Sequence, residues 1–178
     1  MNEIADTCPI IDPAGPATAA VIPLAPGLAS LAGRRVAVLD IAKIRSDAFV
    51  DQVEAGLREH ESSVEIERSV APPSRRLPDD EVANLAGHCD GAVLAVADCG
   101  TCSSWTLFDA IELHRHGCRA VLVISEELRP TIDALAGRLG MNDLPLVEVP
   151  LPNRDQTRAD IAASAEAATP AILAALRG

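Results

Sequence analysis

Aromatic residues and positive charge are both scarce in this sequence. It has no tyrosine, one tryptophan and two phenylalanines among 178 residues, so its core has to be built from Ala, Val, Leu and Ile. The formal net charge of −11 excludes a nucleic-acid partner, because binding phosphates needs a basic surface. The chain also lacks a basic leader with a cleavage pattern and an apolar run of the ~18 residues that span a membrane. We therefore expect a cytoplasmic protein that does not insert into membranes.

Lysine is the scarcest charged residue. Lys43 is the only lysine among 15 basic residues, and the others are arginines. Heavy use of Ala and Arg with almost no Lys is typical of a compositional bias that removes lysine from ordinary surface positions. Lys43 is therefore either an exposed residue that has simply persisted, or an ammonium whose compact charge the planar guanidinium of Arg cannot replace.

Cysteine is present in an odd number, five, which argues against a framework of disulfides in a chain of this size. Cys89 and Cys118 flank predicted strands and are expected to act as small buried hydrophobic residues. Cys8 lies in a proline-rich segment and is given no role. The other two, Cys99 and Cys102, are three positions apart and are the candidates for chemistry.

The chain divides into an N-terminal arm and one globular domain. Residues 1–32 hold five prolines, which remove backbone donors and restrict φ, so we expect an extended arm. Residues 33–178 have the length of a single domain, and a hydrophobic content of 48% excludes the disordered class.

From residue 33 onward, short apolar runs alternate with segments of helical periodicity. This alternation predicts an α/β fold with helices on both faces of a parallel sheet. We expect a single-domain, doubly wound (Rossmann-like or flavodoxin-like) sheet of five strands in the order 2-1-3-4-5, in three layers. Ser46 is expected to cap the first helix, and Gly117 and Gly140 to end two others. The strands are expected at 36–40, 63–67, 91–97, 120–124 and 146–149, and the helices at 47–59, 78–87, 106–116, 127–139 and 155–176.

With this strand order, the connections reverse direction between the first and third strands, which is where doubly wound sheets bind ligands. The loop after the first strand, with Asp40 and Lys43, should therefore face the loop that holds Cys99. Ser125 and Glu126 follow the fourth strand and should form the other wall of this crevice.

The third strand is followed directly by the segment DCGTCSSW, residues 98–105. Its Cys-x-x-Cys spacing allows three interpretations: a redox pair, half of a zinc site, or two inert core residues. A zinc site would need two more ligands, and His114 and His116 lie too far along the following helix to supply them. We therefore predict no metal here, and the glycine and hydroxyls around the thiols are poor core material.

The position of the segment favours reactive thiols. If the helix opens at Cys102 or Ser103, its free N–H groups and positive dipole end stabilise a thiolate or an anionic substrate. Cys99, at the strand end, is the more exposed sulfur and the predicted nucleophile, and Cys102 is the predicted resolving thiol. The predicted substrate contacts are Gly100, Thr101, Ser103, Ser104, Trp105, Asp40, Ser125 and Glu126.

Two carboxylates and the only tryptophan have open roles. Asp98 disfavours a thiolate at Cys99 by like charge, unless it pairs with Lys43 or transfers protons. Asp109 lies on the helix face that carries the second cysteine, and it either reaches toward the site or simply complements the helix dipole. Trp105 is either a pocket wall or packed beneath the loop.

The segment 98–105, with the helical stretch that follows it, resembles the UGSC family, which is named for a selenocysteine-Gly-Ser-Cys motif. Cys99 stands at the selenocysteine position, which many members replace with Cys. The resemblance implies a chemically active nucleophile at Cys99, since selenium contributes reactivity rather than packing, and it favours a functional Lys43. It covers the chain from about residue 10, and the matching parts beyond the motif are 109–113, 31–36, Leu39-Asp40, Lys43, Asp47 and Ser125-Glu126.

Two departures from that family's pattern change the polar groups of the expected pocket. Phe108 stands where a histidine is expected in the helix, which removes an imidazole acid or base. Residues 151–154, Leu-Pro-Asn-Arg, replace a His-Pro-Gly-Gly-like stretch after the fifth strand. These changes imply a specialised substrate or a diverged activity.

The leading hypothesis is an enzyme whose Cys99 thiolate attacks a small, anionic organic electrophile or an oxidised sulfur centre. Cys102 then resolves the adduct as a disulfide, for a net two-electron reduction. No bound cofactor is expected, and an external thiol or a thioredoxin-like partner would reset the site. The alternatives are covalent cysteine catalysis without redox chemistry (lyase, isomerase or transferase) and a non-enzymatic metal-binding or thiol-sensing module. We also expect a homo-oligomer, with the arm and the last helix as candidate interfaces.

Overall fold

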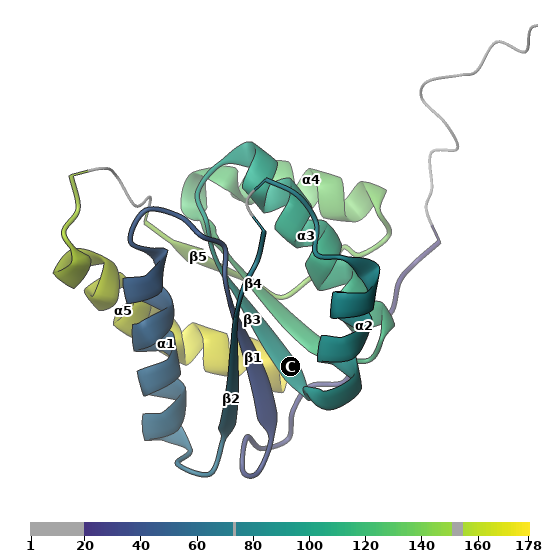
Figure 1. The fold of residues 1–178 in the computed structure, drawn as a ribbon. Helices are drawn as coiled ribbons and strands as arrows, with labels where there is room; N and C mark the ends of the chain where they lie inside the picture. Colours follow the sequence, from purple (N-terminus) through teal and green to yellow (C-terminus); the bar gives the residue numbers. More distant parts are fainter. Residues whose placement is uncertain (1–19, 73, 151–154) are drawn as a thin grey trace, which may run out of the picture.

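The computed structural model describes residues 20–72, 74–150 and 155–178, which form a parallel sheet between two layers of helices (Figure 1). The strands are β1 (Arg35–Asp40), β2 (Glu65–Val70), β3 (Gly91–Ala97), β4 (Arg119–Ser125) and β5 (Leu146–Val149). The helices are α1 (Ser46–His60), α2 (Asp79–His88), α3 (Gly100–Arg115), the 3-10 turn η1 (Glu126–Leu128), α4 (Arg129–Arg138) and α5 (Arg158–Arg177). The sheet order is β2-β1-β3-β4-β5, which confirms the predicted fold class and strand order.

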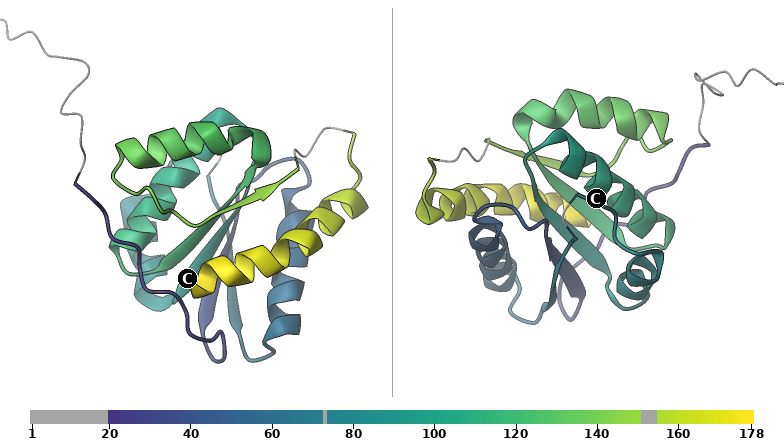
Figure 2. Two further views of the ribbon diagram at one scale, coloured as in Figure 1. Left: turned by 180° about the vertical axis from the view of Figure 1, so that it is seen from behind. Right: turned by 45° about the horizontal axis from the view of Figure 1, so that its top comes forward.

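The sheet has an apolar core on each face, because β3 and β4 are buried along their whole length. Helices α2, α3 and α4 cover one face, and α1 and α5 cover the other (Figure 2). Alternate strand residues divide between the two layers: Leu94 and Leu122 pack on the first, and Val93 and Val121 on the second. Among the buried residues that the structure describes, Phe49 is the single aromatic one, so the core is aliphatic as predicted.

Most elements lie within a few residues of their predicted positions. The main difference is α3, which begins at Gly100 and not at residue 106, because the cysteine segment itself forms the first turns of the helix. Strand β2 also begins and ends two to three residues later than the alternating pattern predicted. Gly117 and Gly140 follow α3 and α4 with φ of 85° and 87°, the left-handed conformation that ends helices at glycine, as predicted.

The described part of the arm, residues 20–32, lies against the domain. The Ile22 N–H donates to the carbonyl of Gly140 at 2.8 Å, and the Ala25 N–H donates to Nδ1 of His114 at 2.9 Å. Leu31 is buried with the α1 and α5 layer. This part of the arm therefore packs as part of the folded unit, while Cys8 and the rest of the arm lie outside the described residues.

Helix α5 is long and apolar enough to cross a membrane by length and composition alone, with a mean hydropathy of 1.3. The sequence pattern predicted this helix at residues 155–176 but showed no apolar run of that length, because its apolar residues are mostly alanines interrupted by charged residues. In the fold, Ala165, Ile172 and Leu176 of this helix are buried against the sheet. Covering the sheet is therefore the role that the structure shows for its apolar face.

Candidate functional site

The predicted crevice brings together the carboxyl ends of β1 and β3. Lys43 lies in the loop between β1 and α1, and Asp98 and Cys99 lie between β3 and α3. The Nζ atom of Lys43 is 2.8 Å from Oδ1 of Asp98 and 3.2 Å from Sγ of Cys99. We call Lys43, Asp98, Cys99 and Cys102 the thiol site.

The loop that carries Lys43 is held by Asp40 and Ser46. The Ser46 hydroxyl donates to Oδ1 of Asp40 at 2.5 Å and accepts the backbone N–H of Lys43 at 2.8 Å. Oδ1 of Asp40 also accepts the N–H of Ala42 at 2.8 Å. Ala42 and Arg45 have φ of 56° and 62°, a conformation that costs a non-glycine residue on the order of 1 kcal/mol, so the loop needs this support.

This arrangement changes two predicted roles. Ser46 is not the cap of α1, since Arg45 occupies that position and Ser46 is the first helical residue. Asp40 is almost fully buried, and its carboxylate is used inside the loop. Both residues therefore position Lys43. The signal was present in the sequence as a short polar loop, but the pattern alone did not show which way the two side chains point.

Cys99 is the N-cap of α3, with φ of −145°, and Cys102 lies in the first turn. The helix therefore opens two or three residues before Cys102 and Ser103, the two openings that the sequence pattern suggested. The reason is that Cys99 itself is the N-cap: its backbone is still extended, and the helix begins at the next residue. The free N–H groups of the first turn are therefore gathered next to the Cys99 sulfur.

Electrostatics at the site favour a thiolate on Cys99. Burial raises the pKa of the Cys99 thiol, but the backbone N–H of Cys102, the Cys102 thiol and the Lys43 ammonium oppose it, and together they hold the pKa below its ordinary value. Burial also disfavours the charge of Lys43, yet its hydrogen bonds to Asp98 and to both thiols raise its pKa. The result is a charged lysine beside a readily ionised cysteine.

The four described cysteines differ in exposure and acidity. Cys99 is partly exposed, and Cys102 is 6% exposed. Burial raises the pKa of Cys89 to about 12 and that of Cys118 to about 12. Of these four thiols, Cys99 combines access from solvent with a lowered pKa, which are the two properties of a nucleophile.

The hydroxyl groups of the first turns bind backbone carbonyls. The Ser103 hydroxyl donates to the carbonyl of Cys99, and the Ser104 hydroxyl donates to that of Gly100, both at 2.8 Å. Ser103 is fully buried, which places it out of reach of a substrate. Gly100 and Thr101 are exposed at the start of α3, directly after Cys99 in the chain.

Asp109 is buried on the side of α3 that faces the segment before α2. Its carboxylate accepts the N–H of Leu77 at 3.2 Å and lies 3.6 Å from Nε of Arg76. Burial raises its pKa to about 6, although the Leu77 N–H and the Arg76 charge oppose this. Within the described residues its polar partners belong to this segment and neither cysteine is among them, so we assign Asp109 a structural role.

Phe108, at the position where a histidine was expected, forms part of an aromatic cluster. The centroid of the Phe108 ring lies 6.0 Å from that of Trp105 and 5.9 Å from the guanidinium carbon of Arg76. The cluster joins two side chains of α3 to one from the segment before α2. It replaces an ionisable imidazole by an apolar and cationic surface.

Exposed apolar side chains lie at the same edge of the sheet as the thiol site. Ile44 follows Lys43 and is 68% exposed, Val70 ends β2 and is 61% exposed, and Trp105 in α3 is 36% exposed. We call Ile44, Val70 and Trp105 the apolar rim.

Ser125 and Glu126 were predicted to form the other wall of the crevice. Ser125, the last residue of β4, is fully buried, and its hydroxyl has no hydrogen-bond partner among the described residues. Glu126 begins η1 and is exposed. Both lie at the carboxyl edge beside β3, and their contact with a substrate stays a prediction. Residues 151–154, the second departure from the family pattern, lie outside the described residues.

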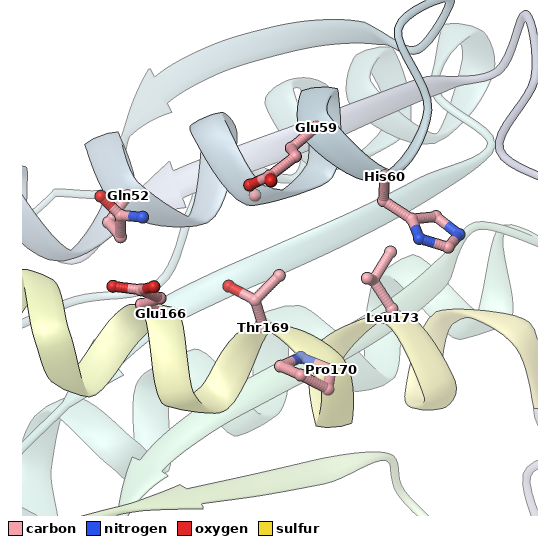
Figure 3. Close-up of a pocket in the computed structure, with 8 residues that line it drawn as sticks. Gln52, Glu59, His60, Glu166, Thr169, Pro170 and Leu173 are labelled. Atoms are coloured by element: carbon pink, nitrogen blue, oxygen red, sulfur yellow. The ribbon is translucent and has the colours of Figure 1, made fainter.

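A groove of about 370 Å³ lies between α1 and α5 (Figure 3). Helix α1 runs from the carboxyl edge of the sheet back to the amino edge, and Glu59 and His60, at its far end, line the groove. Glu166 and Thr169 line it from α5. The groove therefore reaches toward the amino edge of the sheet, whereas the thiol site lies at the carboxyl edge, so the two are separate.

Fold and site together define an α/β protein that presents a cysteine of lowered pKa at the carboxyl edge of a parallel sheet, beside its only lysine. The model of the UGSC family matches residues 9–178, and the chain belongs to that family, as its motif indicated.

Two solved structures are similar to the chain at low identity. The flavodoxin-like domain of a Synechococcus sp. protein is 16% identical with a TM-score of 0.46, over 79% of this chain and 96% of that one. A diflavin flavoprotein A3 from Nostoc sp. is 13% identical with a TM-score of 0.49, over 82% of this chain and 96% of that one. No curated protein matches the chain.

Proposed function

We propose that this protein is a thiol-dependent enzyme in which Cys99 attacks a small anionic substrate and Cys102 resolves the adduct. The observation that carries the proposal is the contact of 3.2 Å between Nζ of Lys43 and Sγ of Cys99 at the start of α3. A cysteine acts as a nucleophile through its thiolate, and a cation and a helix N-terminus both favour that form.

The proposed reaction begins when the Cys99 thiolate forms a bond to an oxidised sulfur atom of the substrate. The bond from that atom to its leaving group breaks, and the leaving group takes the electron pair. Cys102 then loses its proton and attacks the Cys99 sulfur, which releases the substrate sulfur as a thiolate. The products are a Cys99–Cys102 disulfide and a substrate reduced by two electrons. An external thiol or a thioredoxin-like dithiol then reduces the disulfide, so the cycle needs no bound cofactor.

The other groups at this edge divide the work of binding. Lys43 attracts the anionic group of the substrate while it stabilises the thiolate, and Asp98 keeps the lysine charged and in place. Exposed backbone at Gly100 and Thr101 supplies further donors at the helix start. A dithiol that must be reduced between turnovers fits a reducing compartment, which supports a cytoplasmic location.

A second candidate function is covalent catalysis without redox chemistry. It is favoured by the contact of Cys102 with Cys99, because the N–H and the thiol of Cys102 lower the pKa of Cys99 without any redox change at Cys102. In this case Cys99 adds to the substrate and later leaves it, and Cys102 serves only to stabilise the thiolate.

The two candidates are separated with dithiobis(nitrobenzoate), an anionic aromatic disulfide, as the probe. In a Cys8→Ser background, which removes the thiol of the N-terminal arm, redox chemistry predicts that the purified, reduced protein releases two aryl thiolates in quick succession and ends with a Cys99–Cys102 disulfide, which peptide mass spectrometry identifies. Cys102→Ser should release one and keep a mixed disulfide on Cys99. Cys118→Ser, a matched buried cysteine, should behave as the parent protein.

Three other outcomes count against the redox proposal. A stable mixed disulfide on Cys99 in the parent protein favours covalent catalysis without redox chemistry. If Cys99→Ser reacts with the probe as the parent protein does, Cys99 is not the nucleophile. A metal ion held tightly by both thiols of the protein purified without chelator assigns the pair to the non-enzymatic, metal-binding alternative.

A further inference from the structure

A second group of metal-ligating side chains lies beside the edge strand β2. Glu67 belongs to β2, His88 is the last residue of α2, and Cys89 follows it. One donor atom from each side chain lies within 4.8 Å of the donors of the other two. The pattern of the sequence suggested only a small buried residue at Cys89, because Glu67 is 22 positions away along the chain.

The orientation of His88 is set by the helix. Its Nδ1 atom lies 2.5 Å from the carbonyl oxygen of Asn84, and because a carbonyl can only accept, Nδ1 carries the hydrogen. Nε2 is thereby turned toward Glu67 and hydrogen-bonded to Oε2 at 2.6 Å, so one hydrogen lies between these two atoms and is given up when an ion takes its place. A ring nitrogen that donates to a backbone carbonyl while the other faces a set of donors is the usual arrangement of a metal-ligating histidine.

We propose that Glu67, His88 and Cys89 bind one zinc ion through Oε2, Nε2 and Sγ, with the fourth position open to solvent. A carboxylate, an imidazole and a thiolate form a donor set that Zn²⁺ takes in tetrahedral sites, at ~2.0–2.3 Å from each ligand. At such bond lengths two ligand atoms lie roughly 3.4 Å apart. The contact between Glu67 and His88 has to widen by less than 1 Å, which a side-chain rotation provides.

The surroundings can hold the charge of the ion. The carboxylate of Glu67 and the thiolate of Cys89 together neutralise Zn²⁺, and the thiol proton of Cys89 and the hydrogen between Nε2 of His88 and Oε2 of Glu67 are released to solvent on binding. Sγ of Cys89 lies 3.9 Å from Oε2 of Glu67. The nearby guanidinium of Arg35 is paired with Glu65 at 2.6 Å, so its positive charge is already balanced.

This zinc site is separate from the thiol site. Cys89 lies just before β3 and Cys99 just after it, and the seven residues of that strand span roughly 23 Å. The side chains of Glu67 and His88 are 34% and 29% exposed, so an ion can enter from solvent. A test of this zinc site is therefore independent of a test of the proposed chemistry at Cys99.

The test uses the full chain with Cys99→Ser and Cys102→Ser, so that the other thiol pair cannot bind the ion. After treatment with a chelator, the protein is titrated with Co²⁺, which reports a thiolate ligand by a sulfur-to-cobalt charge-transfer band, and then with Zn²⁺ in competition. We expect one ion per chain, a charge-transfer band, and its displacement by Zn²⁺.

Matched variants identify the ligands. Glu67→Gln and His88→Gln should each weaken binding by at least about tenfold, and Cys89→Ser should remove the charge-transfer band. The exposed His116→Gln and the buried Cys118→Ser should leave binding unchanged. Far-ultraviolet circular dichroism checks that each variant is folded. Absence of a charge-transfer band, or equal binding by Glu67→Gln, His88→Gln and their controls, would overturn the proposal.

Discussion

The ammonium nitrogen of Lys43 lies 3.2 Å from the sulfur of Cys99, although 56 positions separate the two residues in the chain. The contact exists because parallel strands place the loops after β1 and β3 at one edge of the sheet. It gives the only lysine of the protein a defined place beside Cys99 and Asp98, which favours the second interpretation of that residue, an ammonium that Arg cannot replace.

Replacing Lys43 should make Cys99 a weaker acid. In Lys43→Gln the ammonium that favours the thiolate is lost, so the pKa of Cys99 rises and its alkylation at neutral pH slows by about tenfold, the effect of a change of one pKa unit. The measurement is the rate of iodoacetamide modification of Cys99 against pH, read by mass spectrometry. Arg115→Gln, at the far end of α3, is the control. An unchanged profile in Lys43→Gln would contradict the assignment.

Ser46 should act on Cys99 without touching it. Ser46→Ala leaves the buried carboxylate of Asp40 short of a donor, which should lower the free energy of unfolding by about 1–3 kcal/mol. The loss of loop support should also slow alkylation of Cys99, since Lys43 is no longer held in place. Urea unfolding and the alkylation profile check both effects. Ser46→Thr, which keeps the hydroxyl, should restore them; if Ser46→Ala loses stability with no change at Cys99, the positioning role is wrong.

His114 and Asp109 should give opposite pH dependences of stability. Burial lowers the pKa of His114 to about 4, with its ring held between Ala25 and Ala120. Its contribution is therefore complete above the ordinary value of 6.5 and is lost as the pH falls toward 4. Burial raises the pKa of Asp109 to about 6, so its contribution is complete below the ordinary value of 3.8 and is lost as the pH rises through 6. Each shift corresponds to at most about 3 kcal/mol.

Single variants should reveal the two terms that cancel in the parent protein. Between about pH 4 and about pH 6.5, Asp109→Asn should become more stable as the pH rises, because the His114 term alone remains. His114→Asn should become less stable over the same range, because the Asp109 term remains. The measurement is the free energy of unfolding in urea at several pH values. Parallel curves for the two variants would contradict both assignments.

The packing of α1 on α5 should depend on the lack of a side chain at Gly56. A Cβ at this position would lie 2.7 Å from Cγ2 of Thr169, whose hydroxyl is held by the carbonyl of Ala165. Gly56→Ala should therefore lower the free energy of unfolding by about 1–3 kcal/mol, despite the better helix propensity of alanine. Thr169→Ala removes the clashing methyl group and should rescue it in the double variant. Additive losses in a double-mutant cycle would contradict the clash.

The elements and their order follow from local pattern. Continuous apolar runs are sufficient for β3 and β4, since a strand buried on both faces needs no polar alternation. Glycine at positions 117 and 140 marks two helix ends, because the left-handed conformation there suits a residue without Cβ. The juxtaposition of Lys43 and Cys99 was predictable as well, once the strand order was inferred from the fold class.

The directions of individual side chains were not predictable in this way. Helical spacing placed Asp109 on the face of Cys102, but the segment before α2 offers it an N–H donor at Leu77 that the pattern does not show. The hydroxyl of Ser46 could have capped α1, but in the fold it donates to the buried carboxylate of Asp40 and accepts the N–H of Lys43.

Sequence pattern was therefore enough to establish the α/β class and the family, and to predict the edge of the sheet and the cysteine that we propose for the chemistry. These properties depend on periodicity, on a motif and on the general rules of parallel sheets. Tertiary structure decided which groups set the acidity of Cys99, which residues hold Lys43, and that Glu67 meets His88 and Cys89. Those facts depend on contacts between residues distant in the chain, which arise only when the two helical layers pack on the sheet.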